Sequence, residues 1–374
     1  MTAPRGLQTA DPGASYRAAA GEIQEAIRRV LESGHYILGP EVEAFEREFS
    51  AYLGVAHAVT VASGTDAVEL ALRAAGVKPG DRVLTVANTA TATVAAIELS
   101  GARAEFVDIE PRTMTMDPEA LAQQMAARRE PAPKAMVPVH LYGHPADLPV
   151  IGEIARRHGL AMIEDCAQAH GATIHGRRVG TWGAAGAFSF YPTKNLGAIG
   201  DGGAVTTGDA LVAERIRLLR QYGWRERYVA EVPGQNSRLD ELQAAILRVK
   251  LTRLEADNQK RRELAAQYLR LLAGAGLKLP ETAAGCEPVW HQFVVRTPAR
   301  ESLKTHLAAA GVQTSVLYPV PLHRQPAYRD DRVHLPVTEQ ASRELLCLPM
   351  HPGLTAEDVD TICRQIMGWS ARKV

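Results

Sequence analysis

The sequence predicts an α/β protein whose large domain has a mostly parallel central sheet and is followed by a smaller α+β domain. Short apolar strands alternate with amphipathic helices between residues 57 and 222, which is typical of a parallel sheet covered by helices on both faces. The length of 374 residues suggests two domains. A long helical pattern then leads into a final third that is organised differently. We place the domains at residues 1–250 and 251–374.

Two helices precede the first strand. The spacing of apolar residues predicts helices over 21–31 and 41–53, closed by Gly34 and Gly54. The alternation follows, and its predicted members are strand 57–62, helix 65–75, strand 82–86, helix 90–99, strand 104–109, helix 118–129, strand 135–139, helix 147–158, strand 160–165, strand 187–191, strand 203–207 and helix 209–222.

A loop over residues 223–237 ends the alternation. It has neither a helical nor a strand period, and a loop of this length is usually functional or an interface arm. Ser237 is the predicted N-cap of a long helix that bends near 250–254 and runs towards residue 272. The remaining elements are predicted as strand 289–296, helix 299–310, a proline-rich segment 318–326 and helix 355–367.

Composition excludes several classes of protein. Net charge is zero and no basic run is long, so neither a nucleic acid nor an acidic membrane is an expected partner. The four cysteines lack C-x-x-C spacing, which predicts neither a disulfide framework nor a zinc site. His140 and His144 are four apart, but Gly143 and Pro145 are incompatible with the helix that a metal site would need, so we expect no metal. With no signal peptide and no membrane span, we expect a cytoplasmic protein.

The stretch from Gly186 to Gly203 contains a single lysine, Lys194. An apolar strand runs into Pro192, which ends strand pairing, and Lys194 follows with no acid within six positions. A lysine in a dry pocket has a pKa below its free value of roughly 10.4 and becomes a nucleophilic amine. We interpret Lys194 as a Schiff-base lysine. The alternative is a surface lysine in a glycine-rich loop.

A carboxylate is expected near this amine. The predicted strand 160–165 is apolar until Glu164 and Asp165 at its carboxyl end, and ligands of open parallel sheets bind outside the carboxyl ends of the strands. Asp165 can pair with a protonated pyridine nitrogen. The alternative is a helix-capping or surface acid.

A phosphate seat is expected at the helix that starts near Thr65. Backbone N–H groups at a helix start that is preceded by glycine favour an anion, and Ser63-Gly64-Thr65-Asp66 has this form. The alternative is an ordinary N-cap by Ser63 or Asp66. A phosphate site at Ser63–Asp66, a carboxylate at Asp165 and an amine at Lys194 are together what pyridoxal 5′-phosphate requires. The glycine fingerprints of nicotinamide enzymes and P-loops and the G-x-S-x-G elbow are missing.

At these residues the chain resembles the sugar aminotransferase family named for DegT, DnrJ, EryC and StrS. The resemblance covers nearly the whole chain. The segments that carry it are Tyr36-Ile-Leu-Gly-Pro-Glu, Ser63-Gly-Thr-Asp-Ala, Gly143-His-Pro-Ala-Asp, Ile163-Glu-Asp-Cys-Ala-Gln-Ala-His-Gly, Phe188-Ser-Phe-Tyr-Pro-Thr-Lys-Asn-Leu-Gly, Gly202-Gly-Ala-Val and Asn236-Ser-Arg-Leu-Asp-Glu-Leu-Gln-Ala-Ala-Ile-Leu.

This resemblance implies the aspartate-aminotransferase fold, which is fold type I of the pyridoxal phosphate enzymes, and a homodimer with shared active sites. Lys194 and Asp165 are then the catalytic residues. The implied cofactor contacts are Gly64, Thr65, Asp66, Asp165, Gln168, Ser189 and Lys194, with Asn236 arriving from the partner subunit. In one position the chain departs from the family pattern, because Ala90 follows Asn88-Thr89 where relatives often have an aromatic residue that stacks on the cofactor.

The implied reaction moves an amino group from glutamate to a nucleotide-linked ketosugar and releases 2-oxoglutarate. The segment beginning at Tyr318 and the one beginning at Asn236 resemble those of enzymes that act on dTDP-3-keto-6-deoxyhexoses. Tyr318 and His323 are substrate candidates, with packing of the small domain as the alternative. Arg238 could meet the donor's carboxylate, with a helix surface as the alternative. A 4-keto-sugar or cyclitol (scyllo-inosose type) aminotransferase and a non-catalytic regulator are the alternative functions.

Overall fold

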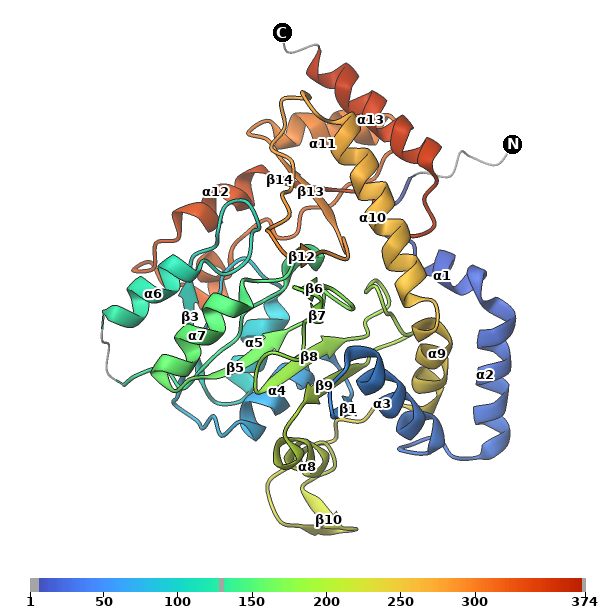
Figure 1. Cartoon of the computed structure of the whole chain (residues 1–374), viewed down its shortest axis with the longest axis vertical. Coiled ribbons are helices and arrows are strands. Elements are labelled where there is room, and N and C mark those ends of the chain that lie inside the picture. The colour runs from blue at the N-terminus through green and yellow to red at the C-terminus, as the bar shows by residue number, and fades with distance from the viewer. Residues whose placement is uncertain (1–6, 128–130, 372–374) are drawn as a thin grey trace.

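A computed structural model describes residues 7–127 and 131–371 and has the predicted α/β architecture (Figure 1). Seven strands form the central sheet in the order β1-β9-β8-β5-β4-β2-β3. In this sheet every neighbouring pair is parallel except the two pairs made by β9. The strands are β1 (His57–Val61), β2 (Arg82–Val86), β3 (Arg103–Val107), β4 (Ala135–Met136), β5 (Ala161–Asp165), β8 (Ala185–Ser189) and β9 (Gly203–Thr207).

Helices cover both faces of the sheet because successive strand residues point to opposite sides. In β5, Ile163 packs in one core and Met162 in the other. The first core lies against α4 (Gly64–Ala74), α5 (Thr91–Leu99) and α8 (Ala210–Leu219). The second lies against α3 (Pro40–Leu53), α6 (Pro118–Ala126), α7 (Leu148–His158) and α9 (Glu241–Leu251).

The two N-terminal helices that the sequence predicts are present as α2 (Ala20–Ser33) and α3. Gly34 and Gly54 follow them with φ of 66° and 77°, which is the left-handed conformation that glycine adopts at helix ends. A further short helix, α1 (Pro12–Ala18), was not predicted. Helix α2 lies outside the sheet and packs on α9, so α9 joins the N-terminal helices to the large domain.

The smaller domain has a core of its own. The predicted bend near 250–254 is confirmed, because α9 ends at Leu251 and α10 begins at Leu254. Leu7 forms a β-bridge with Val312, so the first described residues pack on the smaller domain and not on the large one. The elements of this domain are α10 (Leu254–Leu271), β13 (Phe293–Arg296), α11 (Arg300–Ala309), α12 (Pro336–Glu344), β14 (Leu345–Leu348) and α13 (Ala356–Ser370).

Several predicted boundaries were wrong. The loop 223–237 contains a short hairpin, whose strands are too brief to leave a period in the sequence. Helix α12 and strand β14 were missed, predicted strand 135–139 shortens to β4, and predicted helix 118–129 ends at Ala126, with 128–130 outside the described residues. The remaining small elements are β6 (Thr173–Ile174), β7 (Arg177–Arg178), β10 (Trp224–Glu226), β11 (Val229–Ala230), β12 (Cys286–Glu287), η1 (Leu141–Gly143), η2 (Leu322–Arg324) and η3 (Pro326–Tyr328).

Ser237 is not the N-cap of the long helix. Helix α9 begins at Glu241 after Asp240, and no side chain caps it. The hydroxyl of Ser237 instead donates to Asp66 Oδ2 at 2.5 Å and accepts from the backbone N–H of Ala62 at 3.1 Å. This serine therefore joins the segment before α9 to the start of α4.

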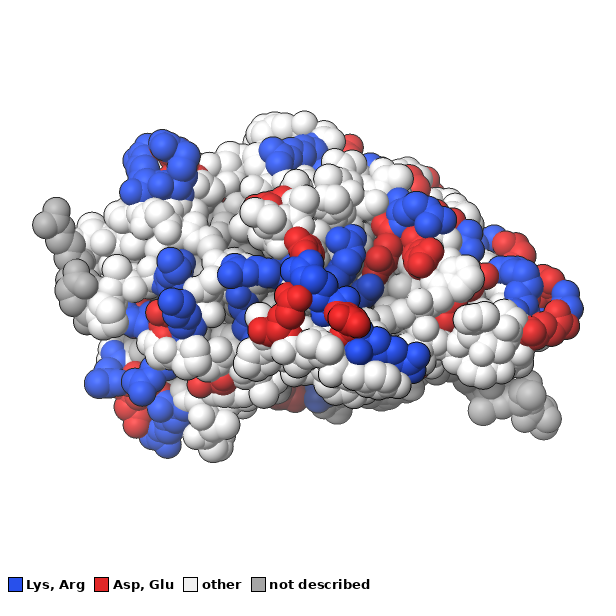
Figure 2. Space-filling view, turned by 90° about the horizontal axis from the view of Figure 1, so that it is seen from below, with Lys and Arg blue, Asp and Glu red and all other residues white. Residues whose placement is uncertain are grey.

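The surface agrees with the mixed composition. Figure 2 shows the face at the α8 end of the molecule, where Lys and Arg side chains lie interspersed with Asp and Glu. Within residues 7–127 and 131–371, the helices include none with both the length and the apolar character needed to cross a membrane.

Candidate active site

The start of α4 meets the end of β8 in a tight corner. Val61 of β1 and Ser189 of β8 both pair with Gly203 of the intervening β9, which brings the two strand ends to the same edge. A Cβ on Gly64 would lie 2.5 Å from the Cβ of Ser189, closer than real side chains approach. Position 64 therefore needs glycine, because a side chain there would displace Ser189.

Both interpretations of the Ser63–Asp66 segment apply. Ser63 caps α4, because its hydroxyl accepts from the N–H of Asp66 at 3.1 Å. The N–H groups of Gly64 and Thr65 belong to the first helical turn, where they have no partner in the helix and suit an anion. The Asp66 carboxylate accepts from the hydroxyls of Ser63 and Ser237, so Asp66 shapes the turn.

Asp165 lies at the carboxyl end of β5 and is held in place by two donors. The hydroxyl of Thr93 donates to Oδ2 at 2.8 Å, and the N–H of Ala167 donates to Oδ1 at 3.1 Å. Thr93 is within 2.9 Å of Thr89, one helical turn earlier. Sequence reasoning missed Thr93, although two threonines four apart at the start of a helix beside the sheet edge were the available signal.

Lys194 follows the turn after β8 and is only partly exposed. Burial lowers the pKa of its amine to about 8, and the negative charge of Asp165 opposes this shift. Among the described residues, Nζ has no hydrogen-bond partner. Burial also lowers the pKa of His170 to about 3 and that of His291 well below its usual value, and in both cases the charge of Lys194 adds to the effect. Burial thus lowers the proton affinity of the amine, and the role of Lys194 as the Schiff-base lysine stays a prediction.

Gln168 connects two tyrosines beside Asp165. Its Oε1 accepts from the N–H of Tyr142 at 2.7 Å, and its Nε2 donates to the hydroxyl of Tyr318 at 3.4 Å. Tyr142 has a left-handed φ of 59° and donates its hydroxyl to the carbonyl of Leu317. Burial and the charge of Asp165 raise the pKa of Tyr318 to about 12. Tyr318 therefore lies in the site, and Tyr142, which was not predicted, supports it.

The comparisons agree with this geometry. The family model for the DegT/DnrJ/EryC1/StrS aminotransferase family matches residues 18–367. The chain belongs to this family. A dTDP-3-amino-3,4,6-trideoxy-alpha-D-glucose transaminase of Streptomyces venezuelae is 47% identical over 366 residues, which are 97% of this chain and 96% of that one. The crystal structure of S. venezuelae DesV has a TM-score of 0.95 at 46% identity and covers 98% of this chain and 99% of that one.

The cofactor of this aminotransferase is pyridoxal phosphate. A solved relative, NtdA of Bacillus subtilis with bound cofactor PMP, has a TM-score of 0.91 at 32% identity and covers 99% of this chain and 86% of that one. The residues present fit the cofactor: the first N–H groups of α4 have no partner in the helix and suit a phosphate, and Lys194 offers an amine whose pKa is lowered by burial and raised by the charge of Asp165. Position 90 of this aminotransferase is alanine, and an aromatic residue whose pKa is raised by the charge of Asp165 is Tyr318.

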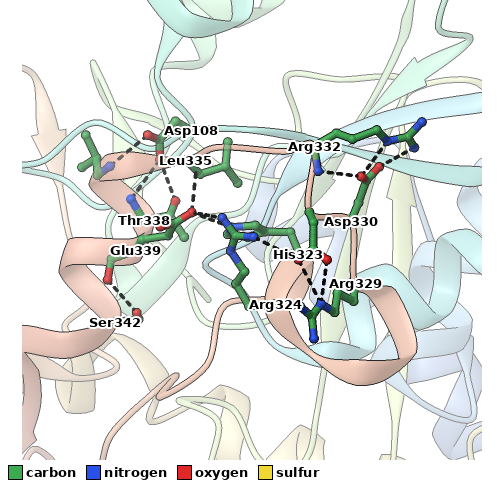
Figure 3. A network of polar contacts seen from close by, with 12 residues as sticks. Asp108, His323, Arg324, Arg329, Asp330, Arg332, Leu335, Thr338, Glu339 and Ser342 are labelled. Atoms are coloured by element: carbon green, nitrogen blue, oxygen red, sulfur yellow. Dashed lines mark hydrogen bonds and ion pairs between the residues drawn. The ribbon is translucent and has the colours of Figure 1, made fainter.

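His323, the other substrate candidate of the segment that begins at Tyr318, has a buried side chain. Its side chain has no exposed surface, and its Nε2 is 3.0 Å from Glu339 Oε1 on α12, which also accepts from Arg324 at 2.9 Å (Figure 3). The preceding residue, Leu322, packs on Ala87 and Val94 of the large domain. His323 therefore contacts both domains, Glu339 on α12 of the smaller one and Phe106 of the large one, and it anchors the segment after Tyr318. Its role toward the substrate stays a prediction.

The two remaining candidates lie on the arm before α9. Asn236 is exposed, as expected of a residue that serves a partner subunit. The guanidinium of Arg238 lies 5.9 Å from the ring centre of Tyr222. Within the described parts of the chain, neither forms a hydrogen bond with Lys194 or Asp165. Their roles stay predictions.

A second buried cluster lies on the other face of β5. His140, Glu164 and Cys166 have potential ligand atoms within 4.8 Å of one another. Glu164 already accepts from the N–H groups of three residues of the turn before β8 at 2.6–2.8 Å. Burial raises the pKa of the Cys166 thiol well above its usual value. The hydrogen bonds of Glu164 stabilise the turn before β8. The absence of a metal stays a prediction.

Proposed function

We propose that this aminotransferase moves the amino group of glutamate to C3 of a dTDP-linked 3-keto-6-deoxyhexose. The observation that carries the proposal is a desolvated Lys194 amine beside Asp165, in a chain that is 47% identical over nearly its full length to a transaminase named for a dTDP-3-amino sugar. The named product of that relative carries its amino group at C3. The same position is therefore the one to test first.

Each residue of the site has a defined task. Gly64, Thr65 and Ser189 would bind the cofactor's phosphate, and Lys194 is the amine that would hold its aldehyde. Bound pyridoxal phosphate supplies an electron sink for the α-carbon of the amino donor. Asp165, held by the hydroxyl of Thr93, would pair with the pyridine nitrogen of the bound cofactor. Lys194 removes the proton from the donor's α-carbon as a base and returns a proton to the sugar carbon as an acid.

We further propose a homodimer in which Asn236 completes the partner's site. Large apolar side chains are exposed around the arm, and such patches mark interaction surfaces. Ile37 pairs with Asp240 at the start of α9, and Ile199 donates its N–H to Gln243 one turn later, so these side chains border one area. The exposed members are Tyr36, Ile37, Tyr191, Ile199 and Tyr228.

The enzyme is placed in the cytoplasm in this proposal. All four cysteines are free thiols, and three of them are buried. Unpaired cysteines are typical of proteins from a reducing compartment.

The test uses purified enzyme loaded with pyridoxal phosphate, a dTDP-3-amino-3,6-dideoxyhexose and 2-oxoglutarate, and it follows glutamate formation in the reverse direction. We expect turnover with the wild type and none with Lys194→Ala, because no other described amine lies in the pocket. Matched reactions contain a dTDP-4-amino sugar or an aminocyclitol of the scyllo-inosose type. A preference for either of these would reject the 3-keto assignment, and equal activity of Lys194→Ala would reject the catalytic role of the lysine.

A further inference from the structure

The residue after Lys194 is held by a buried network that the reaction described above does not use. The side-chain amide of Asn195 donates to Asn258 Oδ1 on α10 at 2.9 Å and to the carbonyl of Val289 at 3.0 Å. Asn258 in turn donates to the carbonyl of His170 at 2.8 Å. Three parts of the chain thus meet at one side chain: the loop that carries the lysine, the helix that connects the domains, and the segment that enters β13.

The same network fixes the tautomer of a buried histidine. The Asn195 amide nitrogen donates to two acceptors, which fixes the orientation of the amide group, and the amide oxygen Oδ1 accepts hydrogen bonds. The Nδ1 of His291 lies 3.1 Å from this oxygen and must therefore carry the hydrogen. The ring is 4% exposed, and burial together with the charges of Lys194 and Arg261 lowers its pKa, so the ring is neutral. Its Nε2 is left with a lone pair.

We propose that His291 is a positioning residue for the catalytic lysine: by donating from Nδ1 to Asn195, it helps to hold the Lys194 loop against α10 and the segment before β13 and limits the access of water to the amine. This inference rests on the proposed role of Lys194. A clamp is needed here because the amine itself has no hydrogen-bond partner among the described residues. Within residues 7–127 and 131–371, the other side-chain hydrogen bonds from this loop to the small domain are those of Asn195 to Asn258 and Val289. Loss of the His291 bond should therefore loosen the loop and expose Lys194 further.

The expected consequence is a change in the proton affinity of Lys194. Its amine has a lowered pKa because it is desolvated, while Asp165 raises the pKa and the neutral rings of His170 and His291 contribute no charge. Releasing the loop lets water reach Nζ, which favours the charged form. We expect the pKa of Lys194 to rise by about one unit when the donor at position 291 is lost. At neutral pH this leaves about tenfold less free amine.

The experiment uses cofactor-free enzyme and four variants at the network. His291→Asn places an amide N–H where Nδ1 lies and should behave as the wild type, whereas His291→Gln places it at the Nε2 position and should not. His291→Leu removes the donor altogether. Asn195→Ala removes the same hydrogen bond without altering the imidazole ring. It replaces His291→Leu in the test if that variant does not fold. His306→Leu, in the small domain, is the control for loss of a histidine away from the site.

Two readouts separate positioning from folding. The pH dependence of Lys194 labelling by an amine reagent, quantified by mass spectrometry, gives its pKa, and stopped-flow absorbance gives the rate of pyridoxal phosphate uptake at pH 7. We expect His291→Gln, His291→Leu and Asn195→Ala to raise the pKa by about one unit and slow uptake about tenfold. A wild-type pKa in His291→Leu, or an equal shift in His291→Asn, would overturn the proposal. Neither readout involves a sugar, so failure of the proposed substrate leaves this test intact.

Discussion

Glu164 and Asp165 are neighbours at the end of β5 but lie on opposite faces of the sheet. Glu164 has no exposed surface, and its two oxygens accept from the N–H groups of Gly180, Trp182 and Gly183, with His140 beside them. Asp165 is 6% exposed, accepts two hydrogen bonds, and its charge acts on the amine of Lys194, which has no hydrogen-bond partner in the part of the chain that the structure describes.

The difference separates a carboxylate that holds the fold from one that acts on a ligand. On the Glu164 face every strong acceptor site is used, so nothing is left to bind. On the Asp165 face, the amine of Lys194 has no hydrogen-bond acceptor among the described residues. Incomplete satisfaction of buried polar groups costs stability and is retained where a ligand completes it. The following changes test this contrast, from the largest expected effect to the smallest.

Asp165→Asn should reduce kcat by about a thousandfold, because the amide keeps the shape of the carboxylate but cannot hold a positive charge on the pyridine nitrogen. The measurement is kcat at saturating cofactor, with thermal unfolding as the control for folding. A melting temperature close to that of the wild type is expected. If kcat falls less than tenfold, Asp165 does not have this role.

Glu164→Gln should have the opposite profile. One side-chain oxygen becomes an NH₂ group that faces backbone N–H donors, which should lower the free energy of unfolding by about 3 kcal/mol. Urea unfolding measures this loss. The kcat of the folded fraction should stay within about threefold of the wild type. A large loss of kcat with unchanged stability would remove the contrast between the two faces.

Gly64→Ala should weaken pyridoxal phosphate binding by about tenfold or more, since the new Cβ would lie 2.5 Å from Ser189 Cβ and displace it from the phosphate corner. Equilibrium dialysis of the cofactor measures the change. Gly21→Ala, on the exposed side of α2 with no atom within 4 Å of the new Cβ, is the matched control and should bind the cofactor normally. Normal binding by Gly64→Ala would show that the phosphate lies elsewhere.

The pH dependence of the free energy of unfolding should report the lowered pKa of Lys194. Its pKa is about 8 in the folded protein and 10.5 in the unfolded chain, so between these values the unfolded state binds more protons and stability rises with pH. We expect cofactor-free wild type to gain about 2 kcal/mol relative to Lys194→Met between pH 8 and pH 10.5. Equilibrium unfolding at several pH values measures the difference, and parallel curves would contradict it.

The sequence was sufficient for most elements of the large domain, because strand periods and glycine stops are local signals, whereas α1, α12 and β14 were missed. The roles of Lys194 and Asp165 stay predictions. The antiparallel direction of β9 could not be derived, since a five-residue apolar strand has the same pattern in either direction. Ser237 looked like a helix cap because its hydroxyl partner, Asp66, is 171 residues away.

The rest of the site depends on distant partners in the same way. His323 lies in a segment that resembles a substrate loop, and only the fold brings it to Glu339 and buries it. His291 had no local signal at all, because its significance comes from Asn195 in another domain. Contacts of this kind are set by tertiary packing, which periodicity and spacing do not encode.

The bond between Ser237 and Asp66 has a consequence for a dimer. It ties the residue next to Asn236, which is expected to serve the neighbouring subunit, to the helix start that seats this subunit's own anion. Binding of phosphate at one subunit's α4 would then stiffen the arm that reaches into the partner's active site. The two cofactors of a homodimer should therefore bind cooperatively rather than independently.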